Sequence, residues 1–253
     1  MIAKKTVSNP ASALGEAVGK VFEAAVLECL KAEANDRDYS VRPEKMVNGT
    51  NNTYQIDAVV FDSDNSPIIL IDPKYIRYTK HNRDKVSWLC VAHYNLRKTY
   101  PTIRKSIAVL AGRWSEPSKE LLRSFGVEIL EVPFEHMVSV LGDHDIEFDW
   151  PERNRDIPGR AFDLWQNLEN EAKAEIGEEL VEAISADLQE SVGRVLDVDL
   201  DSLPARLSEV EVLLKSDRGE IVLQSFGSVL DAVQAMTALL SDKPDISEFI
   251  SSA

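Results

Sequence analysis

Apolar residues recur at a helical period over residues 12–34, which predicts an amphipathic helix near the start of the chain. They occupy positions 14, 18, 22, 25 and 29. Ser12 is placed to cap the first turn of this helix. A second helical pattern covers residues 84–100 and stops at Pro101, because proline does not continue a helix.

Shorter apolar runs predict strands. The runs near 54–61 and 68–74 flank the turn-rich hexapeptide DSDNSP, which predicts a hairpin. Further strands are expected at 39–47, 103–112 and 127–133. The segment 115–126, which begins at a serine and ends at a glycine, predicts a helix between the last two of them. This order of elements predicts an α/β fold with a mixed central sheet flanked by helices.

The second half of the chain has a different pattern. The polar segment 149–158 is bracketed by prolines and predicts a boundary, so we expect a core over 1–149 and a separate region over 150–253. Within that region we expect one or two acidic amphipathic helices over 161–196, a hairpin over 208–226 and a closing helix over 228–240. Dimerisation or regulation is the role we expect for this mainly helical region.

The composition is that of a globular protein: 253 residues with 44% apolar side chains provide a full core. The two cysteines, Cys29 and Cys90, lie in helical patterns, which favours free thiols in a reducing compartment. The sequence shows neither a signal-type apolar segment nor a run of 18 apolar residues. We therefore expect a cytoplasmic protein that spans no membrane.

The net charge of −15 is distributed unevenly along the chain. Residues 1–150 carry 19 basic and 21 acidic side chains, a net of −2, whereas residues 151–253 carry 9 and 22, a net of −13. Within the first part, residues 73–114 hold ten basic side chains and one acid. Because phosphate binding depends on lysine and arginine, this stretch keeps nucleic acid open as a partner.

Two aspartates interrupt the strands of the expected hairpin. The simplest register about DSDNSP pairs Phe61 with Ile68, which places Asp57 opposite Asp72. Strand alternation adds Lys74 and Gln55 to the same face. Opposed carboxylates repel, and either Lys74 or a hard divalent cation would offset the repulsion. A solvated end of the hairpin is the structural alternative, and a shift of one residue in register would separate the acids.

An aspartate in one strand, a turn and an apolar strand that ends in IDPK resemble the PD-(D/E)xK nuclease superfamily. The likeness covers roughly residues 12–135, element order included, and implies a restriction-endonuclease-like core. It implies that Asp57 and Asp72 are metal-binding acids, that Lys74 acts near the attacking water, and that the carbonyl of Pro73 faces the metal. This chain departs from the pattern in two ways: the family more often has glutamate at position 72, and proline at 73 removes a strand N–H group.

The resemblance also implies a catalytic glutamate from the first helix, and Glu23 in GKVFE fits that position, with Glu16 as a weaker candidate. Both lie opposite the apolar stripe, so a solvated helix face is the alternative. The implied cofactor is Mg²⁺, with Mn²⁺ as a substitute. The implied activity is hydrolysis of double-stranded DNA by a homodimeric endonuclease of the restriction or phage-defence type.

The segment KYIRYTKHNRDK interleaves basic and aromatic residues, a composition suited to phosphate contacts. The candidate nucleic-acid contacts are Arg77, Tyr78, Lys80, His81, Asn82, Arg83 and Lys85. Ordinary solubility is the alternative. Two further functions remain open: a catalytically inactive nucleic-acid-binding or assembly protein on the same fold, and an α/β protein whose basic surface binds an acidic partner such as its own second half.

Overall fold

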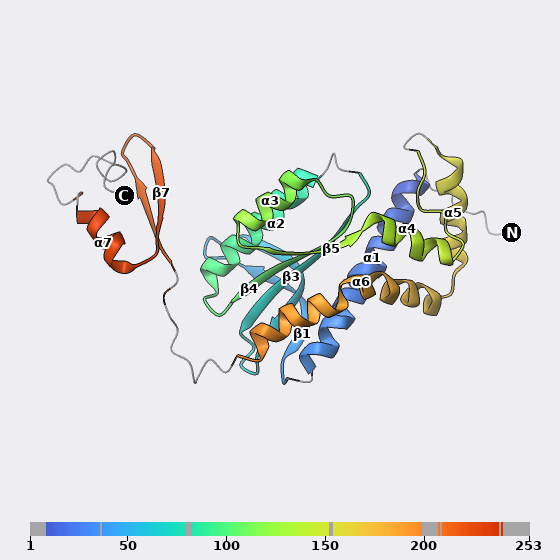
Figure 1. Cartoon of the computed structure of the whole chain (residues 1–253), viewed down its shortest axis with the longest axis horizontal. Helices are drawn as coiled ribbons and strands as arrows, with labels where there is room; N and C mark the ends of the chain where they lie inside the picture. Colours follow the sequence, from blue (N-terminus) through green and yellow to red (C-terminus); the bar gives the residue numbers. More distant parts are fainter. Residues whose placement is uncertain are drawn as a thin grey trace. The chain divides into compact units, whose positions relative to one another are not determined.

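The computed structural model describes residues 9–35, 37–78, 82–151, 154–198, 207, 209–237 and 239. The chain divides into two compact units, Met1–Val198 and Asp199–Ala253 (Figure 1). The first unit therefore extends well past the boundary expected at 149–158. None of the helices within the described ranges is long and apolar enough to cross a membrane.

The first unit is built on a five-stranded sheet in the order β1-β2-β3-β4-β5. Its strands are β1 (Ser40–Val47), β2 (Thr53–Phe61), β3 (Pro67–Ile76), β4 (Lys105–Gly112) and β5 (Glu128–Pro133). The first three strands pair antiparallel and the last three pair parallel. This arrangement confirms the predicted α/β class and its mixed sheet. Strand β4 is buried along most of its length because helices cover both faces of the sheet.

Helices α1 (Pro10–Asn35) and α6 (Asn170–Leu196) cover one face of the sheet (Figure 1). Of the expected apolar stripe of α1, Leu14, Val18 and Phe22 are fully buried in this layer, whereas positions 25 and 29 are only partly buried. The buried stripe continues through Val26 and Leu30 instead. The helix begins earlier than expected: the side chain of Asn9, not Ser12, accepts the first-turn N–H, which Ser12 donates at 3.2 Å. The two helices approach closely at Gly177, where a Cβ atom would lie 2.8 Å from the side chain of Val21.

Helices α2 (Asn82–Thr99) and α3 (Glu116–Ser124) cover the opposite face. Both were expected, α2 from its apolar period and α3 from the serine and glycine that bound it. The buried side of α2 packs on the middle of the sheet through Leu89, Ala92 and Leu96. The polar ends of β2 and β3 therefore lie beneath α2, which places charged groups between a sheet and a helix.

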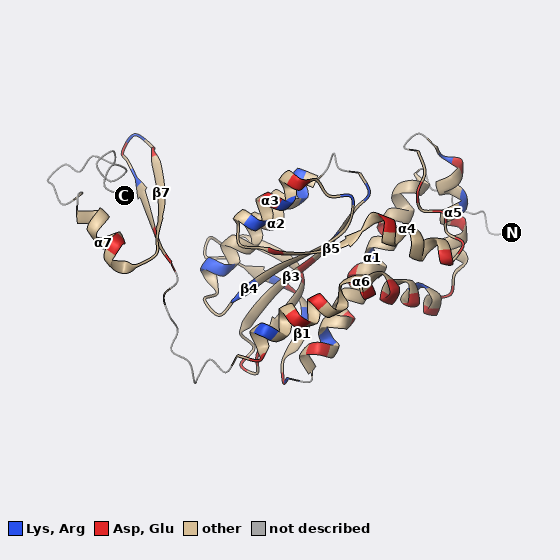
Figure 2. Ribbon diagram, viewed as in Figure 1, with Lys and Arg blue, Asp and Glu red and all other residues tan. Residues whose placement is uncertain are grey.

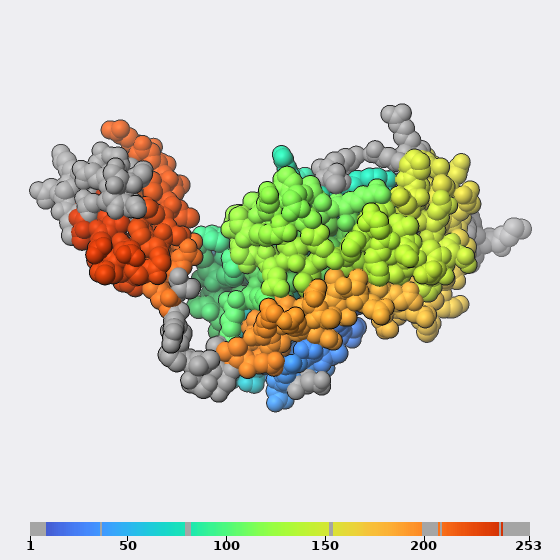
Figure 3. Space-filling model, in the orientation of Figure 1, coloured from blue at the N-terminus to red at the C-terminus, as the bar shows by residue number. Residues whose placement is uncertain are grey.

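Two shorter helices, α4 (Phe134–Asp143) and α5 (Asp156–Asn167), complete the first unit. Helix α4 was not expected, because its apolar residues follow β5 without a polar break. Trp165 of α5 and Ile176 of α6 join the same apolar cluster as α1. The boundary expected at 149–158 thus falls inside this unit, and the last three residues of that segment begin α5. Figure 3 shows α6 as a band along the surface of the unit, next to α4.

The second unit contains β6 (Val210–Lys215), β7 (Ile221–Phe226) and α7 (Val229–Thr237). The expected hairpin is present, and Leu213 pairs with Leu223 across it. Both of these leucines are half-exposed, as are several apolar side chains of α7. A two-stranded hairpin with one helix buries little apolar surface by comparison with the first unit.

Candidate active site

Two irregularities in strand pairing shape the β2–β3 hairpin. Val59 pairs with Leu70, as expected, but Phe61 pairs with Pro67 rather than with Ile68, because the register shifts after Val60. The predicted pairing was therefore wrong at the turn and right in the middle of the hairpin.

A second register shift lies beside Asp57. Arg42 pairs with Val59 and Glu44 pairs with Ile56, so one residue of β1, Pro43, faces two residues of β2. This is a β-bulge at Asp57, next to a proline that has no N–H to give to the ladder. The bulge breaks the strict alternation that we expected, since Ile56 and Val59 pack in one cluster. Gln55 consequently does not share the face of Val59.

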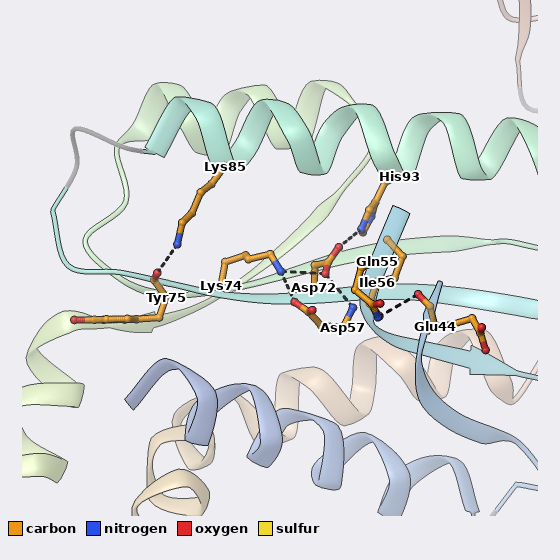
Figure 4. Close-up of polar contacts among 9 residues, drawn as sticks. All are labelled: Glu44, Gln55, Ile56, Asp57, Asp72, Lys74, Tyr75, Lys85 and His93. Atoms are coloured by element: carbon orange, nitrogen blue, oxygen red, sulfur yellow. Dashed lines mark hydrogen bonds and ion pairs between the residues drawn. The ribbon is translucent and has the colours of Figure 1, made fainter. Parts of the chain in front are cut away.

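The expected trio of charged side chains does come together (Figure 4). The backbone N–H of Asp57 donates to Oδ1 of Asp72 at 3.2 Å. The ammonium group of Lys74 lies between the two acids, 3.2 Å from Oδ1 of Asp72 and in a short ion pair with Oδ2 of Asp57. The side chain of Asp72 is only 5% exposed, whereas those of Asp57 and Lys74 are 27% exposed. The site is therefore buried at Asp72 and open to solvent at the other two groups.

A fourth residue, which the sequence reasoning missed, completes the cluster. His93 of α2 is fully buried, and its Nε2 lies 2.8 Å from Oδ2 of Asp72. The signal was present in the sequence, because position 93 falls on the apolar stripe of its helix, four residues after Leu89 and three before Leu96. A histidine on such a stripe needs a buried partner.

The two acids have opposite pKa shifts. Burial, together with the charge of Asp72, raises the pKa of Asp57 to about 6. Burial also acts to raise the pKa of Asp72, but the hydrogen bond and charge of His93, and then the charge of Lys74, lower that pKa to about 2. Burial would lower the pKa of Lys74, yet the charges of Asp72 and Asp57 raise it. At neutral pH, therefore, the site holds an ionised Asp72 and a protonated Lys74.

A cavity of about 700 Å³ opens beside Lys74. It lies between the first turns of α1 and the end of β3, and its charged lining residues are Glu16, Lys20, Glu23, Lys74, Arg77 and Lys85. Burial raises the pKa of Glu23 even though Lys74 and Lys85 act to lower it, which places this carboxyl group near both lysines. The expected solvated face of the helix is thus partly covered at Glu23. Glu16 is mostly exposed and pairs with Lys20 at 2.7 Å.

The chemistry of these groups fits a hard divalent cation. Asp57 and Asp72 provide carboxylate oxygens, with Glu23 on the adjoining cavity wall, and such oxygens are the ligands that Mg²⁺ prefers. The ammonium group of Lys74 bridges the two aspartates and offsets their repulsion. Over the described ranges, no three His, Cys, Asp or Glu side chains are arranged as a ready-made metal cluster. Pro73 is buried on β3 between the two charged residues.

The candidate nucleic-acid contacts have different environments. Arg77 is 7% exposed, donates to the carbonyl oxygens of Phe148 and Trp150 and stacks on the Trp150 ring at 3.7 Å. Asn82 is buried and donates to the carbonyl of Arg113 at 3.3 Å. Both side chains are thus engaged inside the fold, and a nucleic-acid contact for either of them stays a prediction.

Three of the remaining candidates keep an accessible surface. Arg83 and Lys85 are exposed on the first turn of α2, and Tyr78 is half-buried. Lys85 also donates to the carbonyl of Tyr75 at 3.3 Å, which holds it at the cavity (Figure 4). Lys80 and His81 lie outside the described residues.

Seven of the 22 acidic side chains of residues 151–253 lie on α6, whose acidic residues are marked in Figure 2. This helix packs against α1, on the face of the sheet opposite α2. It reaches the basic stretch through Lys105, which donates to the carbonyl of Ser191 at 3.0 Å and pairs with Glu128 of β5. Helix α6 therefore lies on the other face of the sheet from α2, whose His93 contacts Asp72.

Comparisons with known proteins give no family for this chain. No family model matches it, and no curated protein matches it significantly. A solved structure described as "Protein of Unknown Function AF1548" aligns with 70% of this chain and 98% of its own, at 10% identity and a TM-score of 0.34. At this level the likeness supports no argument about function.

Proposed function

We propose that this protein is a metal-dependent endonuclease that hydrolyses double-stranded DNA, of the restriction or phage-defence type. The observation that carries the proposal is the convergence of Asp57, Asp72 and Lys74 at the open end of the β2–β3 hairpin. The order of elements around them is the one that the PD-(D/E)xK resemblance implies. We extend that resemblance to a restriction-endonuclease-like core.

Phosphodiester hydrolysis requires an activated water and stabilisation of negative charge on the phosphoryl group. A divalent cation held by Asp57 and Asp72, with Mg²⁺ as our proposal and Mn²⁺ as a substitute, would act as a Lewis acid there. The raised pKa of Lys74 keeps it protonated at neutral pH. Its role is therefore to bind a phosphate oxygen and stabilise the developing charge, rather than to abstract a proton.

Proton transfer in the proposed reaction falls to Glu23. This carboxyl group lines the same cavity as Lys74, and burial raises its pKa towards the range useful for a general base. The nearby lysines, Lys20 and Lys85, offer positive charge to the flanking phosphates. The cavity would thus combine a carboxyl group that accepts a proton from the attacking water with lysines that bind the phosphates of the substrate.

The test is cleavage of a panel of supercoiled, linear duplex, single-stranded and branched DNA, with Mg²⁺ or with EDTA. We expect Mg²⁺-dependent cleavage of duplex DNA, at a rate that Asp57→Asn and Lys74→Met each lower by at least about 10²-fold. The matched control is Asp64→Asn, because Asp64 is exposed at the tip of the same hairpin. Undiminished cleavage by Asp57→Asn or by Lys74→Met would remove that residue from the chemistry.

A second function, nucleic-acid binding without catalysis, is favoured by one observation. Lys74 bridges the two acids, an arrangement that is satisfied without a metal. This alternative predicts DNA binding that weakens with salt, is unchanged by EDTA and leads to no cleavage of any substrate in the panel.

A further inference from the structure

The imidazole of His93 is fully buried, and within the described part of the chain its polar partner is Asp72. Nε2 lies 2.8 Å from Oδ2 of Asp72, while Nδ1 is buried and has no hydrogen-bond partner among the residues that the structure describes. An ionised carboxylate only accepts hydrogen bonds, so Nε2 of His93 is the donor to Asp72. A buried nitrogen without a partner is unfavourable, and α2 carries one at the position whose side chain contacts Asp72.

The carboxylate of Asp72 is held at both oxygens. Oδ2 accepts from His93 on α2, and Oδ1 accepts from the backbone of Asp57 and from Lys74. These donors come from a helix above the sheet and from two strands within it, as Figure 4 shows. Contacts from opposite sides fix the rotation of the carboxylate, whereas Lys74 alone would leave it free to turn about its χ2 angle.

We propose that His93 is a positioning residue for Asp72: it fixes the direction of Oδ1, so that this oxygen faces Asp57 and Lys74 at the proposed metal-binding position. The inference rests on the proposed function, because it assigns His93 a role in that same site. Residues that orient a metal-binding side chain contribute about 10–100-fold to metal affinity or activity. His93 does not touch the substrate or the metal, and it acts only through Asp72.

Two substitutions separate positioning from simple filling of the core. His93→Gln keeps a side-chain N–H donor that can reach Oδ2 of Asp72, whereas His93→Leu fills the space without a donor. The first measurement is Mn²⁺ binding by the full chain, followed by electron paramagnetic resonance. We expect His93→Leu to weaken Mn²⁺ binding by about 10–100-fold and His93→Gln to recover most of that loss.

Cleavage kinetics provide the second measurement. For His93→Leu we expect kcat to fall by about 10–100-fold, with KM for duplex DNA little changed, since the phosphate-binding lysines are intact. Thermal unfolding of both variants checks that each is folded at the assay temperature. The inference would be overturned if folded His93→Leu bound Mn²⁺ and cleaved DNA as well as the wild type does. It would also be overturned if folded His93→Leu and His93→Gln lost Mn²⁺ affinity and kcat to the same extent.

Mn²⁺ binding also distinguishes this inference from the proposed function. A wild-type chain that binds Mn²⁺ through Asp72 but cleaves no DNA would contradict the nuclease activity and still test His93 by its effect on affinity. A wild-type chain that binds no Mn²⁺ would overturn the positioning role together with the metal site.

Discussion

The two halves of strand β3 differ sharply in what they bury. From Ile68 to Ile71 the strand is apolar and inaccessible to solvent on both faces. From Asp72 to Lys74 the strand carries charge, although Asp72 is nearly as buried as the apolar residues before it. The apolar half needs only close packing, because dispersion and burial are not directional. The charged half is stabilised by specific hydrogen-bond donors to Asp72, which are the backbone N–H of Asp57 on β2 and the imidazole of His93 on α2.

The largest effect should come from placing a charge in the apolar half. Ile71→Asp buries a carboxylate with none of the partners that Asp72 has, so we expect a loss of more than about 4 kcal/mol of unfolding free energy. Urea unfolding followed by circular dichroism measures it. The control is Ile221→Asp in the second unit, where the side chain is 65% exposed and the change should be below about 1 kcal/mol. Equal losses in the two variants would contradict the comparison.

Removing the central acid should come next. Asp72→Ala leaves the buried N–H of His93 and the backbone N–H of Asp57 without an acceptor, and we expect a loss of about 3–5 kcal/mol in the same unfolding experiment. Combining it with His93→Leu removes the stranded donor, so the double variant should lose less than the sum of the two single losses. Strict additivity would show that the two residues are not coupled.

Loss of the bridging cation should have a smaller effect on stability than on activity. In Lys74→Met the aliphatic stem is kept and the charge is removed, so Asp57 and Asp72 are left to repel each other. We expect a loss of about 1–3 kcal/mol in urea unfolding and a fall of about 10²–10³-fold in any cleavage rate. A variant as stable as the wild type would show that Lys74 is not needed to hold the acids together.

The pH dependence of stability should show the smallest effect. The pKa of Asp57 is raised to about 6, above its unfolded value, so the folded state binds this proton more tightly. Relative to Asp57→Asn, the wild type should therefore gain on the order of 1–2 kcal/mol as the pH falls from 7 through 6 towards 4. Asp72 has the opposite sign: its contribution is present above its unfolded pKa and is lost as the pH falls towards 2.

That pH effect is measured by urea unfolding of the two proteins in parallel at half-unit pH steps. Stability curves for wild type and Asp57→Asn that run parallel between pH 7 and 4 would show that the pKa of Asp57 is unshifted.

The sequence was sufficient to predict the sheet, most helices and the meeting of Asp57, Asp72 and Lys74. Apolar period and turn residues encode these features locally. The bulge at Asp57 and the register shift at Phe61 could not be predicted, because a period of two contains no information about an extra residue in one strand.

The sequence also could not predict which individual charged residues are buried. Arg77 belongs to a basic stretch that suggested a DNA contact, yet its guanidinium group is enclosed by Trp150 and two carbonyl oxygens more than 70 positions away in sequence. His93 shows the converse: its helical position signalled burial, but its partner on β3 was visible only in three dimensions.

The most direct test of the central claim is the nicking of a supercoiled plasmid by wild type, Lys74→Met and Asp64→Asn, each with Mg²⁺ and each with EDTA. We predict nicking by wild type and Asp64→Asn in Mg²⁺, none in EDTA, and a rate for Lys74→Met at least about 10²-fold lower. Nicking that persists in EDTA, or that Lys74→Met performs at the wild-type rate, would contradict a metal site built on Asp57, Asp72 and Lys74.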